Sequence, residues 1–110
     1  VCCAAALANS EVLMDQEPWL GQVDEKGALF RALLEHQRIK EVRQIGLMLA
    51  VELESAEQVD TVIAALLKRG IIGFYFLSTR NAFRLAPPLC ISEDEIRWAS
   101  AEILAVLSTL

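Results

Sequence analysis

The chain has 110 residues, of which 55% are hydrophobic and 23% are charged, a balance that is typical of one packed domain and excludes disorder. The formal net charge is -5 and the ten basic residues form no run, so nucleic acid and anionic membranes are poor partners. No apolar segment predicts a membrane-spanning helix.

The cysteines and the histidine indicate the cell compartment and the absence of a metal site. Cys2 and Cys3 are neighbours that would pair only through a strained ring, and Cys90 makes the set odd. This favours a reducing, cytoplasmic environment in which the cysteines are buried apolar residues. His36 is the single histidine and there is no C-x-x-C spacing, so we expect no metal.

Two helices are predicted at the start of the chain. Residues 1–14 are rich in alanine and leucine, and residues 15–18 break this first helix. Pro18 suits the first turn of a second helix reaching about residue 36. Its apolar stripe is formed by Leu20, Val23, Phe30 and Leu34. The chain begins with valine inside a predicted helix, which suggests a fragment or a processed product.

The middle of the chain predicts a long strand followed by a helix. Residues 42–53 are rich in β-forming residues, and we interpret Gly46 as a kink or bulge in one strand. Ser55 and Gln58 form a capping box that opens the helix, and Gly70 ends it in a left-handed conformation.

Two short strands and a helix complete the prediction. Residues 71–77 and 82–86 are the strands, with 78–81 as a hairpin loop and a double proline after the second strand. Ser92 and Glu95 form a capping box for the last helix. Its apolar stripe contains Ile96, Ala99, Ile103, Val106 and Leu110.

The element order predicts a single α+β domain over residues 1–110, with two leading helices followed by β-α-β-β-α. Because crossovers are right-handed, the three strands should form a mainly antiparallel sheet in the order 1-3-2, with the last strand in the middle. The helices should cover one face of this sheet. The other face and the leading helix would then need cover from elsewhere.

Arg84 is the strongest candidate for a site residue, because it places a guanidinium in the predicted central strand between two apolar residues. Alternation puts Ala82 and Ala86 on the same face, so the guanidinium has room to bind a carboxylate with both arms. Two structural alternatives stay open. Arg84 could simply lie on an exposed face, or it could pair with Glu52.

The other polar residues favour structural roles. Arg43 is expected on the solvent side of its strand, and His36 near a helix end, with no catalytic role. Lys26, Lys40 and Lys68 fall on polar helix faces or in loops, where imine chemistry is not favoured. There is also no glycine-rich phosphate loop. We therefore expect no catalytic, cofactor-binding or metal-binding residue in this chain.

Three segments together resemble the C-terminal part of class III aminotransferases. They are CCAAALANSEVL (residues 2–13), VRQIGLMLAVEL (42–53) and NAFRLAPPL (81–89), and SEDEI at 92–96 extends the similarity. This family consists of fold-type I enzymes that use pyridoxal 5′-phosphate (PLP), typified by acetylornithine, ornithine and 4-aminobutyrate aminotransferases.

The resemblance implies that residues 1–14 are an interdomain-type helix and that 15–110 are the C-terminal small domain. Arg84 matches an arginine that binds the substrate α-carboxylate in acetylornithine-type members and pairs with a protein carboxylate in others. The family's Schiff-base lysine and its other PLP ligands belong to the large domain. Gln44 stands where the family often has glycine. The resemblance thus implies an enzyme as the parent protein and no activity for the isolated chain.

The parent would be a homodimer that transfers an amino group from an amino acid or ω-amine to a 2-oxo acid, using PLP. This domain would contribute binding of the substrate carboxylate and closure of the active site, with the large domain as its partner. The alternative is a stand-alone amino-acid-binding regulatory or assembly module without catalysis, since such modules share the β-α-β-β-α pattern. The leading helix separates the two, because a free-standing sensor would not need it.

Overall fold

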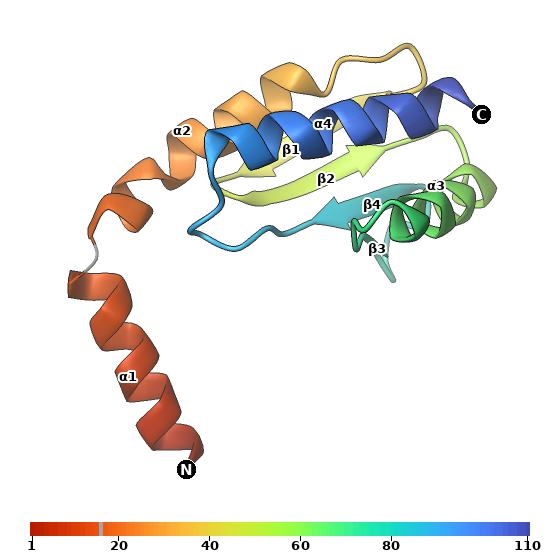
Figure 1. Ribbon diagram of the computed structural model, residues 1–110. Coiled ribbons are helices and arrows are strands. Elements are labelled where there is room, and N and C mark those ends of the chain that lie inside the picture. Colours follow the sequence, from red (N-terminus) through yellow and green to blue (C-terminus); the bar gives the residue numbers. More distant parts are fainter. Residues whose placement is uncertain (16) are drawn as a thin grey trace.

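The computed structural model describes residues 1–15 and 17–110, which form four helices and four strands (Figure 1). In chain order these are α1 (Cys2–Asp15), α2 (Glu17–Leu33), β1 (Glu41–Ile45), β2 (Met48–Glu52), α3 (Ala56–Lys68), β3 (Phe74–Tyr75), β4 (Ala82–Leu85) and α4 (Glu93–Ser108). The predicted α+β class is confirmed. The predicted break over 15–18 includes Gln16, which lies outside the described residues, and Pro18 lies in the first turn of α2.

Ser55 and Ser92 cap the starts of α3 and α4 as predicted, but the reciprocal half of each capping box is not formed. Gln58 Oε1 has no hydrogen-bond partner among the described residues, and the Glu95 carboxylate accepts a hydrogen bond from the Ser92 hydroxyl instead. The Ser55 hydroxyl accepts a hydrogen bond from the Gln58 amide at 3.3 Å, and Ser92 accepts one from Glu95 at 3.1 Å. These side chains satisfy amides that have no partner within their helices. After α3, Gly70 has φ +83°, a conformation that glycine adopts without a steric cost. Both helix starts and the end of α3 therefore follow from local chemistry.

The sheet has the strand order β1-β2-β4-β3, and all three pairings are antiparallel. The last strand lies between its neighbours, as predicted. The prediction of one long strand with a bulge at Gly46 was wrong, because β1 and β2 form a hairpin in which Ile45 pairs with Met48. Gly46 has φ +55° and Leu47 has a negative φ, as expected when glycine opens a two-residue type II′ turn.

Helices α2, α3 and α4 cover one face of the sheet and enclose the core (Figure 1). The fully buried core side chains are Leu49, Val51, Leu53, Val59, Val62, Leu66, Phe83, Ile96, Ile103 and Leu107. Phe30 and Leu34 of the predicted α2 stripe are buried as well, but Leu20 is 50% exposed. Leu20 lies in the first part of α2, and the described helix reaches the sheet only further along.

Helix α2 approaches the β1–β2 hairpin closely enough to require glycine on both sides. A Cβ atom built on Gly27 would overlap the backbone carbonyl oxygen of Gly46. A Cβ on Gly46 would lie 2.6 Å from Val23 Cγ1. The Gln44 amide donates a hydrogen bond to the same Gly46 carbonyl at 3.0 Å. This contact sets the distance between α2 and the sheet.

Replacing Gly27 with alanine should destabilise the fold by about 1–3 kcal/mol, because the overlapping atom belongs to the backbone and relief requires moving α2. Gly21 is the matched control, since it lies in the same helix and an added Cβ would meet nothing within 4 Å. Gly21→Ala should be neutral or stabilise by up to about 1 kcal/mol through helix propensity. Urea unfolding of both variants tests this, and equal effects would contradict the close approach.

Helix α1 projects away from the rest of the structure, and α2 is the only described element that it contacts (Figure 1). None of its residues is buried. The prediction of buried cysteines was wrong, because Cys2, Cys3 and Cys90 are all free and exposed. The first two have no core beside them, and Cys90 lies in the turn that precedes α4. In the described part of the chain, no helix has the length and apolar character needed to cross a membrane.

Candidate functional site

No described helix covers the face of the sheet opposite α2, α3 and α4, and we call it the open face. Because side chains alternate along strands, this face can be assigned from the burial pattern and the strand register. Its members are Glu41, Arg43, Ile45, Met48, Ala50, Glu52, Phe74, Ala82 and Arg84. Ile45, Met48 and Phe74 are 85%, 64% and 55% exposed. The open face therefore combines large apolar side chains with charged ones.

Arg84 lies on the open face in β4, where its neighbours are Ala50 of β2 and Phe74 of β3. Its guanidinium carbon lies 5.5 Å from the centre of the Phe74 ring, within the range of a cation–π contact. Among the described residues, no carboxylate oxygen lies within 4.0 Å of this guanidinium. The alternative in which Arg84 pairs with Glu52 was therefore wrong. The guanidinium is exposed and can donate hydrogen bonds to a carboxylate from outside the chain.

Glu52 pairs instead with Arg43, which lies on the solvent side of β1 as predicted. Arg43 Nη1 lies 2.7 Å from Glu52 Oε2 and 2.7 Å from Glu41 Oε2. The other oxygen of Glu52 accepts a hydrogen bond from the Asn81 amide at 3.3 Å. The hydrogen bond from Arg43 and its positive charge lower the pKa of the Glu52 carboxyl, with smaller contributions from Asn81 and Lys40. Sequence reasoning missed this cluster, because Arg43 and Glu52 share a face only when residues 41–45 and 48–52 form a hairpin.

The lowered pKa of Glu52 predicts part of the acid sensitivity of the fold. The stabilisation is present above the ordinary glutamate pKa and is lost as the pH falls through the lower folded value. Glu52→Gln should therefore reduce the loss of stability across this acidic window, measured by urea unfolding at a series of pH values. Glu54→Gln is the control, because Glu54 has no ion pair among the described residues and the variant keeps the Arg43 cluster. If Glu52→Gln lost as much stability at acidic pH as the unaltered chain, the attribution of this loss to Glu52 would be contradicted.

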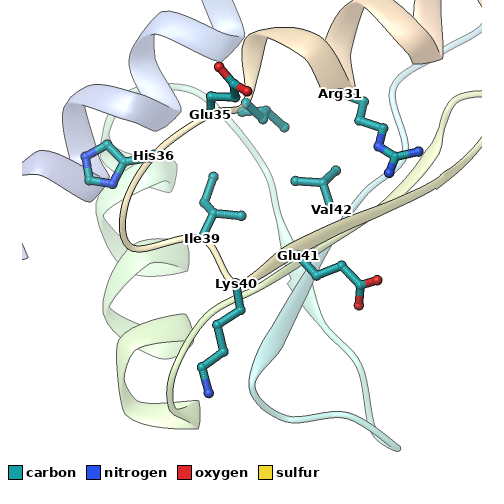
Figure 2. A pocket seen from close by; sticks show the side chains of 8 residues that line it. Arg31, Glu35, His36, Ile39, Lys40, Glu41 and Val42 are labelled. Carbon is teal, nitrogen blue, oxygen red and sulfur yellow. The ribbon is translucent and has the colours of Figure 1, made fainter.

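A hollow of about 380 Å³ lies between the end of α2 and the start of β1 (Figure 2). Its lining consists of Arg31, Leu34, Glu35, His36, Ile39, Lys40, Glu41 and Val42. Figure 2 shows the Lys40 side chain pointing away from Glu35 and His36. Both nitrogens of His36 have partners, since Nε2 lies 3.2 Å from Ser108 Oγ and Nδ1 accepts from the Arg38 amide at 3.1 Å. This hollow does not bring an acid and a base together.

The three lysines named in the sequence analysis differ in their exposure. Lys40 and Lys68 are exposed, whereas Lys26 is 9% exposed and its ammonium donates to the Leu89 carbonyl at 3.1 Å. The prediction that Lys26 lies on a polar helix face was wrong. Helix α2 packs against the segment that follows β4, and this packing buries Lys26. Its hydrogen bond ties these two parts together.

The comparison with known proteins identifies the class of this domain and then its family. The Aminotransferase class-III family matches residues 1–107. The chain is 33% identical over its whole length to acetylornithine aminotransferase of Haemophilus ducreyi and covers 27% of that protein. It is 36% identical to ornithine aminotransferase of Bordetella pertussis, with 98% of the chain covering 26% of the relative.

Solved structures agree with this match. An aminotransferase of Bacillus anthracis superposes with a TM-score of 0.87 at 25% identity, with 98% of this chain covering 28% of that one. Ornithine aminotransferase of Toxoplasma gondii, in which PLP partially occupies the active site, superposes with a TM-score of 0.83 at 32% identity over 97% of this chain and 26% of that one. The chain thus spans about a quarter of the length of its relatives. It belongs to the class III aminotransferase family, which confirms the resemblance seen in the sequence.

Proposed function

We propose that this chain is the C-terminal small domain of a PLP-dependent aminotransferase, in which Arg84 binds the carboxylate of the substrate. The parent enzyme transfers an amino group from an amino acid or ω-amine to a 2-oxo acid. The observation that carries the proposal is the exposed guanidinium of Arg84, which has no carboxylate partner among the described residues of a class III chain.

The surroundings of Arg84 support a carboxylate-binding role. The opposite residue on β2, Ala50, is small, so the guanidinium can receive a carboxylate without a clash with its neighbour. The Phe74 ring limits the orientations of the guanidinium while leaving its N–H groups unpaired. A carboxylate bound by two parallel N–H donors is fixed in orientation as well as in position. The contribution of this domain is therefore to bind and orient the substrate and to exclude water as it closes over the site.

The remainder of the active site comes from the large domain of the parent chain. PLP, when bound there, supplies the electron sink for transfer of the amino group. In this arrangement α1 is the interdomain helix, which accounts for its exposed Leu7 and Met14, at 61% and 71%. The full-length enzyme is a homodimer. We place the parent enzyme in the cytoplasm, and the three exposed free thiols support this, because such thiols persist in a reducing compartment.

A stand-alone module that binds an amino acid without catalysis is the competing function. Such a sensor would bury its helices in its own fold or in a defined dimer, whereas α1 has no buried residue. The isolated chain should therefore self-associate through α1 instead of forming a defined dimer that binds an amino acid. The first experiment is to read the gene upstream of Val1. A large domain with the PLP lysine supports the proposal, and a reading frame that opens close to Val1 overturns it.

In the full-length enzyme, Arg84→Ala should raise KM for the carboxylate substrate about 10- to 100-fold, because a hydrogen bond to a charged group contributes about 1.5–3 kcal/mol. Steady-state kinetics with the carboxylate substrate and with an amine that lacks a carboxylate would separate this role from a general loss of activity. Arg97→Ala is the control, since Arg97 is exposed on α4, a helix on the opposite side of the sheet from the open face (Figure 1). An unchanged KM in Arg84→Ala would sink the assignment.

A further inference from the structure

We infer that Arg43 is a positioning residue that holds Glu52 away from Arg84, so that the Arg84 guanidinium stays free for a carboxylate from outside the chain. The functional consequence rests on the role of Arg84 given above. The pairing preference itself rests on the geometry of the open face and can be tested without activity.

The strand register places Glu52 within reach of both arginines. Ala50 of β2 lies opposite Arg43 on one side and opposite Arg84 on the other. Glu52 lies two residues along the same strand and on the same face, which makes it the diagonal neighbour of each arginine. Diagonal neighbours on a sheet lie roughly 7–8 Å apart, a distance that glutamate and arginine side chains span together. One carboxylate thus stands between two guanidinium groups.

The observed contacts show which of the two arginines binds the Glu52 carboxylate. Glu52 Oε2 lies 2.7 Å from Arg43 Nη1, while Oε1 accepts from Asn81 at 3.3 Å. Both carboxylate oxygens are therefore engaged, one by Arg43 of β1 and the other by Asn81 next to β4, and neither lies within 4.0 Å of the Arg84 guanidinium. Arg84 contacts the Phe74 ring and has no ion pair among the described residues.

Glu41 explains why Arg43 is needed for this arrangement. Glu41 and Glu52 are directly opposite each other in the β1–β2 ladder, where like charges repel. Arg43 binds both carboxylates and so removes the repulsion. Without Arg43, Glu41 would push the Glu52 carboxylate toward β4. The positive group that Glu52 meets there is Arg84, and a bound Glu52 would occupy the donors that an external carboxylate requires.

A carboxyl titration of Glu52 in the whole chain tests the inference. The ¹³C signal of the Glu52 side chain, identified by its loss in Glu52→Gln, would be followed against pH in four proteins: the unaltered chain, Arg43→Gln, Arg84→Gln and the double variant. Lys40, Glu41 and Asn81 also face Glu52, but they are common to all four and cancel in the comparison. The difference between Arg43→Gln and the double variant therefore isolates the contact with Arg84.

Transfer of Glu52 to Arg84 predicts a definite pattern. In Arg43→Gln the pKa of Glu52 should stay about one pH unit below that in the double variant, as expected for a carboxyl that has gained an opposite charge. Arg84→Gln alone should leave Glu52 unchanged. Equal values in Arg43→Gln and the double variant would overturn the inference. A rise of the Glu52 pKa in Arg84→Gln as large as the rise in Arg43→Gln would also overturn it. Arg84→Gln keeps the Arg43 cluster and its contribution to folding.

Kinetics of the full-length enzyme separate this inference from the proposed function. Arg43→Gln should raise KM for the carboxylate substrate about tenfold, and Arg43→Gln with Glu52→Gln should restore it, because no carboxylate then remains to occupy Arg84. If Arg43 had a purely structural role, the added Glu52→Gln substitution would not restore KM. If the titration shows the transfer but KM does not respond, the carboxylate-binding role of Arg84 is wrong and the pairing preference stands.

Discussion

The close approach of Gly27 to Gly46 is the contact on which the arrangement of this domain depends. Only two residues without side chains allow the α2 backbone to lie against the turn of the β1–β2 hairpin. Once α2 is at this distance, Phe30 and Leu34 reach the core and the helices occupy one side of the sheet. The opposite side is left without cover. The open face is therefore a consequence of how α2 packs.

The open face shows two arginines of one sheet in different surroundings. Arg43 is bound by two carboxylates of its own chain, and its charge is satisfied locally. Arg84, one strand beyond Ala50, has an aromatic ring as its neighbour and no carboxylate among the described residues. An uncompensated guanidinium beside exposed apolar side chains gains most from a bound anion when a second surface excludes water from it. This is the physical basis for assigning carboxylate recognition to Arg84.

The two surfaces without cover suggest that the domain is part of a larger assembly. Helix α1 has no buried residue, and the open face exposes Ile45, Met48 and Phe74. Large apolar side chains exposed in this way often mark a contact with another domain or protein. The chain spans about a quarter of the class III aminotransferases to which it is related, so most of each relative is available to provide that contact.

Features that depend on neighbouring residues could be predicted from the sequence. The capping hydroxyls of Ser55 and Ser92 and the left-handed Gly70 act within a few residues, so the limits of α3 and α4 follow from local chemistry. The central position of the last strand followed from the handedness of crossovers. The family was evident from three segments in order, and Arg84 stood out as a charge in an apolar strand.

Features that depend on packing between distant segments could not be predicted from the sequence and are seen in the fold. Gly46 suits a bulge and a hairpin turn equally well, and the choice depends on whether residues 41–45 fold back on 48–52. Lys26 became buried because α2 packs beneath the segment after β4, and the cysteines stayed exposed because α1 packs on nothing but α2. The partner of Glu52 could not be predicted from the sequence, since both Arg43 and Arg84 are its diagonal neighbours in the sheet. The neighbouring charge of Glu41, placed opposite by the register, favours Arg43 and leaves Arg84 free.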